Sequence, residues 1–371
     1  MTPYRLTYDQ LLADLYQAYY DARRHKRRKA YQLRFEAERD ARLRALCNEL
    51  WSRTYKARPS ACFIITDPKK REVFAADFRD RIVHHLYYNY THSLYERTFI
   101  EDTYSCIPGR GTHYGIRRLQ RHICRESQNY TLPCYVLKMD IRGYFMHIRR
   151  ARLLSLCLAA LDQMASHRIL RHVPTTWEER IDMDFVRYLT REIVLLDPTK
   201  DCYVVGHIDD WNDLPANKSL FRSPVGCGLP IGNLTSQLFS NVYLNVLDQY
   251  MKRALHCVHY GRYVDDFFVV SADRDRLHGL ISPVRRFALQ SLGLTLHDGK
   301  TQICDVRYGV EFLGTTVKPF HNVAGRVALR RMTPKIRQCM QNIPLSNESL
   351  VSFGGLLCHG KNYHKIKQLL Q

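Results

Sequence analysis

The sequence predicts an α+β fold, because short strands that end or begin at aspartates alternate with segments of helical spacing. Residues 261–270 have the pattern of a strand, a tight turn with Asp265 and Asp266, and a second strand. An apolar run from Cys134 forms a further strand that ends at Asp140, and residues 234–250 carry apolar side chains at helical spacing.

Three aspartates therefore lie at the ends of predicted strands. Adjacent carboxylates such as Asp265 and Asp266 repel each other unless a cation lies beside them. Mg²⁺ fits this place, because it prefers oxygen ligands and usually takes one or two carboxylates together with substrate phosphates. For the hairpin alone, an Asp-Asp turn without chemistry is an equal alternative, because Asp is common in turns. The third carboxylate, Asp140, favours the metal site.

The charge of the chain points to a polyanionic partner. Its 371 residues carry 56 Lys and Arg against 36 Asp and Glu, a formal net charge of +20, and they suffice for two or three subdomains. Such an excess is typical of nucleic-acid-binding proteins; a solubility device or a membrane-surface protein is the alternative. There is no apolar run of about 18 residues and no apolar segment after Met1, so we expect neither a membrane span nor secretion. Twelve cysteines without a Cys-x-x-Cys pair predict free thiols in a reducing cytoplasm.

Residues 1–50 are predicted to form a basic, mostly helical N-terminal extension. Seven consecutive basic residues at 23–29 would cover every side of a helix, so they form a block of positive charge rather than one solvated face. We expect this block to contact an RNA backbone or an acidic partner; a flexible basic linker is the alternative. The predicted contacts are Arg23, Arg24, Lys26, Arg27, Arg28 and Lys29.

A strand at 62–65, a turn with Lys69 and a returning strand from Arg71 form a predicted hairpin. Basic side chains at its tip and return can clamp a triphosphate through charge-assisted hydrogen bonds. After a helix that begins near Phe78, a glycine-bearing loop leads into another basic helix. Arg110 in that loop is a predicted RNA contact, and an ordinary turn is the alternative.

Phe145 follows Asp140 by five residues and is a candidate steric gate. A bulky aromatic at this distance from a metal carboxylate can lie under the sugar of a bound nucleotide and collide with a 2′-hydroxyl. The alternative is a core aromatic. Residues 150–222 are expected to be helical in two patches, at 151–161 and 180–196, and then a polar surface loop.

Three glycines at 226–232 precede the helix at 234–250 and allow the backbone to approach a ligand closely. The N-terminus of this helix offers free N–H groups to a phosphate or to the nascent base pair. After the Asp265 hairpin we expect a helix at 276–292, a strand and turn that lead to Lys300, and a basic tail that forms a small helical subdomain.

The segments around Asp140-Ile141-x-x-Tyr144-Phe145 and Tyr263-Val264-Asp265-Asp266 resemble the palm of reverse transcriptases, and the likeness extends over roughly residues 50–315. The resemblance implies a right-hand polymerase: an extension at 1–50, fingers and palm at 51–314, and a thumb-like region at 315–371.

The same resemblance implies the roles of individual residues. Asp140 and Asp265, with the carbonyl of Ile141, would hold two Mg²⁺ ions that activate the primer hydroxyl and steady the triphosphate, and Asp266 would support them. Lys69 and Arg71 would neutralise phosphate charge. Lys300 would give a proton to pyrophosphate, with a surface lysine as the alternative. Phe145, Ile231 and Gly232 would line the nucleotide site.

A narrower resemblance rests on residues 228–244, Gly-Leu-Pro-Ile-Gly-Asn-Leu-Thr-Ser-Gln and onward, and on 78–85, 111–113 and 358–363. These stretches are similar to the reverse transcriptases of diversity-generating retroelements, which carry an aliphatic residue at the place of Ile231 where most reverse transcriptases carry Gln. The resemblance implies cDNA synthesis from a template-repeat RNA, with adenines copied unfaithfully, to diversify a target gene. It also implies an accessory variability determinant protein, a small helical oligomer, as partner.

Two alternatives remain open at this point. Within the class, the chain could be a phage-defence or group II intron-type reverse transcriptase. In another class, it could be a non-catalytic RNA-binding scaffold, although such a scaffold has no use for a cluster of like charges.

Overall fold

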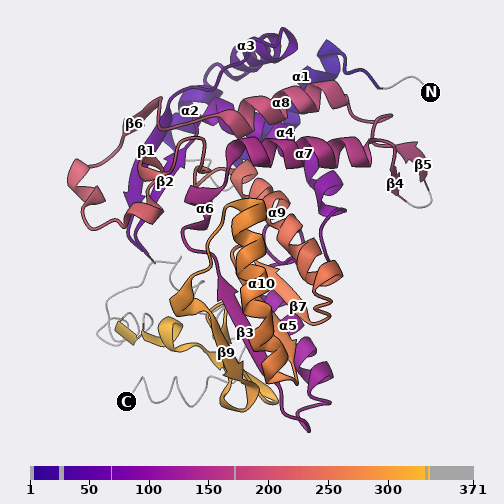
Figure 1. The fold of residues 1–371 in the computed structure, drawn as a ribbon. Coiled ribbons are helices and arrows are strands. Elements are labelled where there is room, and N and C mark those ends of the chain that lie inside the picture. The colour runs from indigo at the N-terminus through magenta and orange to yellow at the C-terminus, as the bar shows by residue number, and fades with distance from the viewer. Residues whose placement is uncertain (1–3, 25–28, 68, 171–172, 331–332, 335–371) are drawn as a thin grey trace. The chain divides into compact units, whose positions relative to one another are not determined.

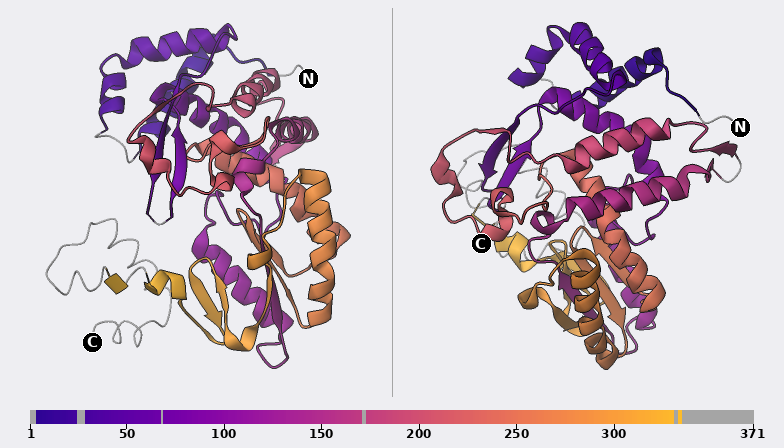
Figure 2. Two further views of the ribbon diagram at one scale, coloured as in Figure 1. Left: turned by 60° about the vertical axis from the view of Figure 1, so that its left-hand side comes forward. Right: turned by 45° about the horizontal axis from the view of Figure 1, so that its top comes forward.

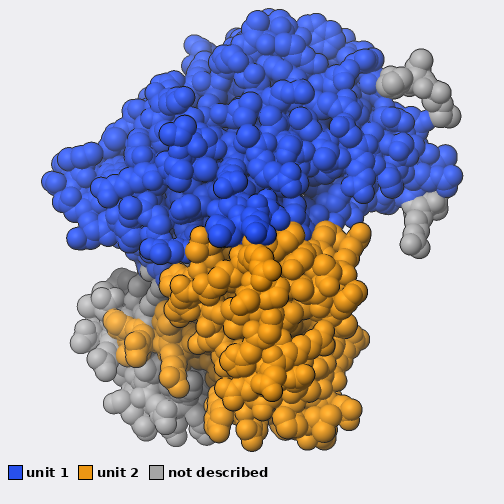
Figure 3. All heavy atoms as spheres, in the orientation of Figure 1, with its two compact units in different colours: residues 1–100, 142–248, 288–294 blue, residues 101–141, 249–287, 295–371 orange. Residues whose placement is uncertain are grey.

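The computed structural model describes residues 4–24, 29–67, 69–170, 173–330 and 333–334. The chain divides into two compact units (Figure 3): unit 1 contains residues 1–100, 142–248 and 288–294, and unit 2 contains 101–141, 249–287 and 295–371. Each unit is therefore assembled from segments that are distant in the sequence. Within the described ranges, no helix combines the length and the apolar character needed to cross a membrane.

Unit 1 begins with three helices (Figures 1 and 2): α1 (Tyr8–Arg23), α2 (Ala30–Glu36) and α3 (Arg39–Trp51). Thr7 and Gln10 start α1 with a reciprocal capping box, in which the Gln10 N–H donates to Thr7 Oγ1 at 3.3 Å. The buried side of α1 packs on α4 (Phe78–Glu96). The helical character predicted for residues 5–50 is confirmed in the described residues.

The predicted hairpin is present in unit 1 as β1 (Ser60–Ile65) and β2 (Arg71–Ala75), paired antiparallel. A short strand, β6 (Cys202–Val204), adds to β1 in parallel, so the sheet order is β2-β1-β6. The predicted helical patches correspond to α7 (Arg150–Ala165) and α8 (Met183–Leu195), which pack together. The remaining elements are α6 (Tyr144–His147), the β4 (Arg168–Leu170) and β5 (Val173–Thr176) ribbon, α9 (Leu234–Gln249), and the short helices Ile208–Trp211, Ala216–Lys218 and Leu220–Arg222.

Glu72 fastens the irregular segment 205–222 to strand β2. Its carboxylate is 1% exposed and accepts hydrogen bonds from Trp211 Nε1 at 2.7 Å and from Ser219 Oγ at 2.8 Å. It also accepts from the main-chain N–H of Leu220. A buried carboxylate that accepts several donors holds the segments that supply them, so part of the loop predicted to lie on the surface is anchored to the sheet.

Unit 2 is built on a four-stranded antiparallel sheet of order β7-β8-β3-β9. Its strands are β7 (Tyr260–Tyr263), β8 (Asp266–Ser271), β3 (Tyr135–Asp140) and β9 (Gln302–Asp305). Helix α5 (Thr112–Glu126) covers one face, where its apolar side chains share a core with Val136, Phe268 and Val270. The other elements are α10 (Arg274–Leu292), of which residues 274–287 belong to this unit, the π-helical turn Tyr250–Ala254, and the short helices Asp298–Lys300 and Val306–Tyr308.

Part of the tail differs from its prediction. Residues 315–324 were expected to begin a helical subdomain, but they form strands β11 (Thr315–Lys318) and β12 (His321–Ala324), which join β10 (Val310–Phe312) in a three-stranded sheet. The β-branched run Thr315-Thr316-Val317 favours this strand, because such side chains pack well on a pleated surface. Residues 335–371, which include the predicted motif at 358–363, lie outside the described residues.

Candidate active site

The register of the sheet in unit 2 brings two of the predicted aspartates opposite each other. Strand β3 ends at Asp140, strand β8 begins at Asp266, and these two residues are Cα partners. Strand β7 ends at Tyr263, so Val264 and Asp265 form the two-residue turn of the hairpin. Both aspartates were predicted to lie in the turn, whereas Asp266 is the first residue of the second strand. Three carboxylates thus meet at one end of one sheet.

The turn that carries Asp265 has an unfavourable backbone conformation. Val264 has φ = +55°, in the left-handed region, and Asp265 is not among the residues with positive φ. This is the pattern of a type II′ turn, in which glycine is usual at the first position. A β-branched residue in this region costs about 1–3 kcal/mol and persists only where the surroundings enforce it.

Two hydrogen bonds enforce the conformation of Val264. Its carbonyl oxygen accepts from Arg262 Nη1 at 2.9 Å, and its N–H donates to Ser105 Oγ at 3.1 Å. Both contacts lie within unit 2. Neither partner was predicted as a site residue. Ser105 is 159 positions from Val264 along the chain, so its contact is not visible in the local sequence.

The carboxylates make this end of the sheet electrostatically unusual. Burial raises the pKa of Asp266 to about 6; Asp140 and Asp265 also raise it, while the ammonium groups of Lys138 and Lys300 oppose the rise. Lys300 Nζ lies 2.7 Å from Asp140 Oδ2. A carboxyl group with a raised pKa among like charges favours a cation beside it. Lys138 was not predicted as a site residue, although its spacing two residues before Asp140 put it on the same face of the strand.

These residues fit a divalent cation whose coordination shell is completed by substrate atoms, rather than a cation that protein side chains enclose alone. No group of three or more His, Cys, Asp or Glu side chains in the described part of the chain is arranged to hold a metal ion by itself. Mg²⁺ usually takes only one or two carboxylates, and phosphate oxygens complete its shell. Asp140 and the 265–266 pair could supply those carboxylates. Ile141, whose carbonyl was predicted as a further ligand, follows β3 directly and forms a bridge with Leu296.

Phe145 and Ile231, predicted for the nucleotide site, pack against the same cluster of unit 1. Both are partly buried and pack against one cluster of Cys62, Phe74, Met146 and Leu220. The Phe74 N–H donates to the Ile231 carbonyl at 3.0 Å, so Ile231 is fixed to strand β2. Phe145 therefore contributes to a packed cluster, and this is compatible with either of its two predicted roles.

Three further predicted nucleotide contacts lie on or beside the β1–β2 hairpin of unit 1. Lys69 and Arg71 are exposed, at the tip and at the start of β2. Gly232 has φ = +122°, and a Cβ there would lie 2.8 Å from Val73 Cγ1. Glycine is therefore required at 232 for both its conformation and its close approach to β2.

Three of the predicted RNA contacts have partners within the protein. Arg23 pairs with Glu36 at 3.1 Å and Arg24 with Asp21 at 3.4 Å. Arg110 Nη1 donates to the main-chain oxygens of Glu101 and Thr103 at 2.8 and 3.1 Å, so it supports the loop that contains it. Lys29 is exposed. Lys26, Arg27 and Arg28 lie outside the described residues, and RNA binding by this block stays a prediction.

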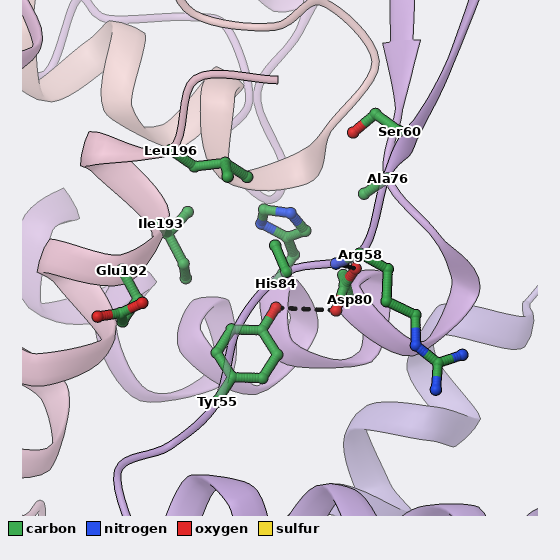
Figure 4. Close-up of a pocket in the computed structure, with 10 residues that line it drawn as sticks. Tyr55, Arg58, Ser60, Ala76, Asp80, His84, Glu192, Ile193 and Leu196 are labelled. Carbon is green, nitrogen blue, oxygen red and sulfur yellow. Dashed lines mark hydrogen bonds between the residues drawn. The ribbon is translucent and has the colours of Figure 1, made fainter. Parts of the chain in front are cut away.

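A small pocket in unit 1, lined by both polar and apolar side chains, has a different character (Figure 4). Burial raises the pKa of Asp80 to about 6, but this carboxylate accepts from Tyr55 Oη at 2.9 Å, the Arg58 N–H at 2.8 Å and Arg79 Nη1 at 3.1 Å. Burial lowers the pKa of His84 to about 4, and its Nδ1 lies 2.8 Å from a threonine hydroxyl at the start of α9. Because Tyr55, Asp80 and His84 are hydrogen-bonded within the protein, we assign this pocket a structural role in joining α4, α9 and the segment before β1.

Comparisons with known proteins show which family the sequence resembles. The family model described as reverse transcriptase (RNA-dependent DNA polymerase) matches residues 68–317, a range that contains all three site aspartates and Lys300. Protein YkfC of Escherichia coli (strain K12) is 26% identical over 309 residues, which are 73% of this chain and 70% of that protein.

Among solved structures, telomerase from Candida albicans in complex with a TWJ fragment of telomeric RNA is 11% identical with a TM-score of 0.47, over 76% of this chain and 50% of that one. Apo telomerase from Candida tropicalis is 12% identical with a TM-score of 0.45, over 71% and 47%. The chain thus spans about half the length of these telomerase chains.

Proposed function

We propose that this chain, which belongs to the reverse transcriptase family of RNA-dependent DNA polymerases, makes error-prone cDNA from a template-repeat RNA for the diversification of a target gene. Family membership supplies the general activity, RNA-directed DNA synthesis from deoxynucleoside triphosphates. The specialised use is supported by residues 228–244 and by the aliphatic Ile231, which resemble the reverse transcriptases of diversity-generating retroelements.

The observation that carries the catalytic part is the pairing of Asp140 with Asp266 at the end of the sheet, with Asp265 in the turn. Asp140 and Asp265, with the Ile141 carbonyl, would hold Mg²⁺, and Asp266 would reinforce the negative field that attracts it. Bound Mg²⁺ would lower the pKa of the primer hydroxyl and neutralise the leaving pyrophosphate.

The basic residues have the complementary task in this proposal. Lys69 and Arg71 extend positive charge towards substrate phosphates, where it lowers the cost of charge that develops in the transition state. Lys300 holds the Asp140 carboxylate in the absence of a divalent cation and is close enough to the site to serve as a proton donor.

Primer extension on an RNA template tests the catalytic assignment. Asp140→Ala and Asp265→Ala should abolish nucleotide incorporation while RNA binding survives, because the carboxylates act on the reaction and not on the template. Asp305→Ala is the matched control: it lies on the same sheet opposite Tyr135, at the far end of β3 from Asp140, and should polymerise normally. Incorporation near the wild-type rate by either site variant would contradict the assignment.

The proposed low fidelity at adenine is assigned to Ile231. A Gln at this position could hydrogen-bond near the incoming nucleotide and the template base, whereas Ile cannot. Restoring about 1.4 kcal/mol of discrimination changes the error frequency about tenfold. Ile231→Gln should therefore lower misincorporation opposite adenine, and Ile231→Leu, which stays apolar, should not. Sequencing of the cDNA measures both, and an unchanged error spectrum in Ile231→Gln would place the determinant of fidelity elsewhere.

The resemblance also suggests the accessory variability determinant protein as a partner. Synthesis of cDNA on the RNA encoded upstream of the gene, with and without that protein, tests the partnership. Equal yield and equal adenine errors in both reactions would argue against it.

A further inference from the structure

A segment with no role in the reaction so far runs beside the hairpin that carries Asp265. The Arg262 N–H donates to the Asp102 carbonyl at 2.9 Å, and the Tyr104 N–H donates to the Arg262 carbonyl at 3.0 Å. Thr103 forms a parallel bridge with Arg262. The main chain at 102–104 is therefore attached to β7, and this attachment brings the next residue, Ser105, to the turn.

Ser105 and Arg262 fix the two peptide groups that flank the Cα of Val264. The Ser105 hydroxyl accepts from the N–H of Val264 at 3.1 Å, and Arg262 Nη1 donates to its carbonyl at 2.9 Å. Both side chains are buried, with exposed fractions of 1% for Ser105 and 0% for Arg262. Side chains without access to solvent have few alternative positions, so the two contacts act as a fixed clamp on the turn.

The clamp matters because the conformation that it holds is one that valine avoids. Val264 has φ = +55°, and the next residue along the chain is Asp265. If Val264 relaxed to a negative φ, the peptide that leads into Asp265 would rotate, and the Asp265 carboxylate would turn away from Asp140 and Asp266.

We propose that Ser105 is a positioning residue for nucleotide addition, and that with Arg262 it holds Val264 in the left-handed conformation that aims the Asp265 carboxylate. This inference rests on the proposed catalytic role of Asp265. It differs from a purely structural role for Ser105, in which the hydroxyl would stabilise the fold without setting the direction of any carboxylate.

A double-mutant cycle of Ser105→Ala and Val264→Gly tests the proposal in single-nucleotide incorporation. Ser105→Ala should lower kcat about tenfold, the effect expected for one buried hydrogen bond, and leave the KM for the nucleotide within about twofold. In the Val264→Gly background the same change should cost about twofold or less, because glycine adopts positive φ without a steric penalty. Ser105→Thr keeps the hydroxyl and should restore the rate.

Binding of Mn²⁺, followed by electron paramagnetic resonance in the absence of substrate, gives a readout that does not depend on turnover. Ser105→Ala should weaken Mn²⁺ binding, and Val264→Gly should suppress that loss. Ser127→Ala is the matched control, because this serine is also 1% exposed and accepts a main-chain N–H, that of Tyr130 at 2.8 Å, at the end of α5. It should change stability without a loss of Mn²⁺ binding.

Three results would decide against the proposal. An equal rate loss from Ser105→Ala in the wild-type and Val264→Gly backgrounds would overturn it, as would unchanged Mn²⁺ binding in a folded Ser105→Ala protein. If Ser105→Ala does not fold, Ser105→Thr takes its place in the test. A Ser105→Thr protein that has an unchanged melting temperature but does not polymerise normally would also overturn the proposal. Asp265→Asn tests the proposed catalytic site separately from the role of Ser105. An active Asp265→Asn protein would refute the proposed site itself. If Asp265→Asn is inactive but the effects of Ser105→Ala and Val264→Gly are additive, only the role of Ser105 is refuted.

Discussion

Replacement of Asp266 by Asn should stabilise the fold while it impairs polymerisation. Burial and the neighbouring aspartates raise the pKa of Asp266 from 3.8 to about 6. At pH 8 the side chain is ionised in both the folded and the unfolded chain, and a shift of about two units then costs the folded state roughly 3 kcal/mol. Asn keeps the shape of the side chain without its charge. Without divalent metal at pH 8, Asp266→Asn should therefore raise the free energy of unfolding by up to about 3 kcal/mol.

The pH dependence of this gain follows from the direction of the shift. A carboxyl group whose pKa is raised in the folded state favours folding below its unfolded pKa, and that contribution is lost as the pH rises through the folded pKa. The advantage of Asp266→Asn should be largest at pH 8, shrink as the pH falls below about 6, and be small near pH 4. It should vanish only below the unfolded pKa of 3.8, where wild-type Asp266 is protonated in both states. Addition of Mg²⁺ should narrow the gap at pH 8, because a cation stabilises the ionised cluster.

Urea unfolding in EDTA at pH 8, 6 and 4 measures the effect, and Asp305→Asn is the control of opposite sign. The Arg307 side chain lowers the pKa of Asp305, so loss of that carboxylate should slightly destabilise the protein at pH 8. A destabilised Asp266→Asn protein at pH 8, or a gain of the same size at all three pH values, would refute the electrostatic reasoning.

Lys300→Met removes the ammonium group that lies 2.7 Å from Asp140. In EDTA the substitution should lower the free energy of unfolding by less than about 1 kcal/mol, because the ion pair is partly exposed. Mn²⁺ should bind more tightly, because the ammonium group no longer competes for the carboxylate. Weaker Mn²⁺ binding, measured by titration, would contradict that competition. Glu72→Gln places amide hydrogens against the donors of the 211–220 segment. Measured by urea unfolding, it should lower the free energy of unfolding by about 3 kcal/mol. A loss below about 0.5 kcal/mol would show that Glu72 does not anchor this segment. Phe145→Val should raise ribonucleotide incorporation about tenfold or more if this side chain excludes the 2′-hydroxyl, and an unchanged preference for deoxynucleotides would leave it as a core aromatic.

Elements with strong local patterns agreed with their predictions. The helices α7 and α8 have apolar residues at helical spacing, and the hairpin at 261–270 and the strand that ends at Asp140 consist of β-favouring residues beside the aspartates. Strand β6 was not predicted, because three residues are too few to show a period, and it exists only because it pairs with β1. The strands at 315–324 were missed although the run Thr315-Thr316-Val317 favours a strand. Strand β11 pairs with β10 and β12 pairs with β11, and the local sequence does not reveal these pairings.

The site shows the same division between local and long-range information. Asp140, Asp265 and Asp266 were identified by residue type and by position at the ends of strands. Ser105 could not be identified in this way, because a serine is common in loops and its importance depends on a contact across 159 positions. Arg110 shows the converse: it was assigned to RNA as one charge in a basic loop, but its guanidinium supports main-chain oxygens nearby.

The arrangement of the carboxylates depends on the same side-chain alternation that builds the core of unit 2. Val136 and Asp140 lie on one face of β3, and their partners across the strand pair are Val270 and Asp266. Val136 and Val270 are buried in the core beneath α5. A slip of one residue between β3 and β8 would turn one strand's aspartate to the opposite face of the sheet. Both faces of these strands are apolar, since Met139 and Phe267 on the other face are also 0% exposed, so burial alone does not select the register. The observed register unites Asp140 with Asp266, whereas the direction of Asp265 is set separately, by the turn and the contacts that hold it.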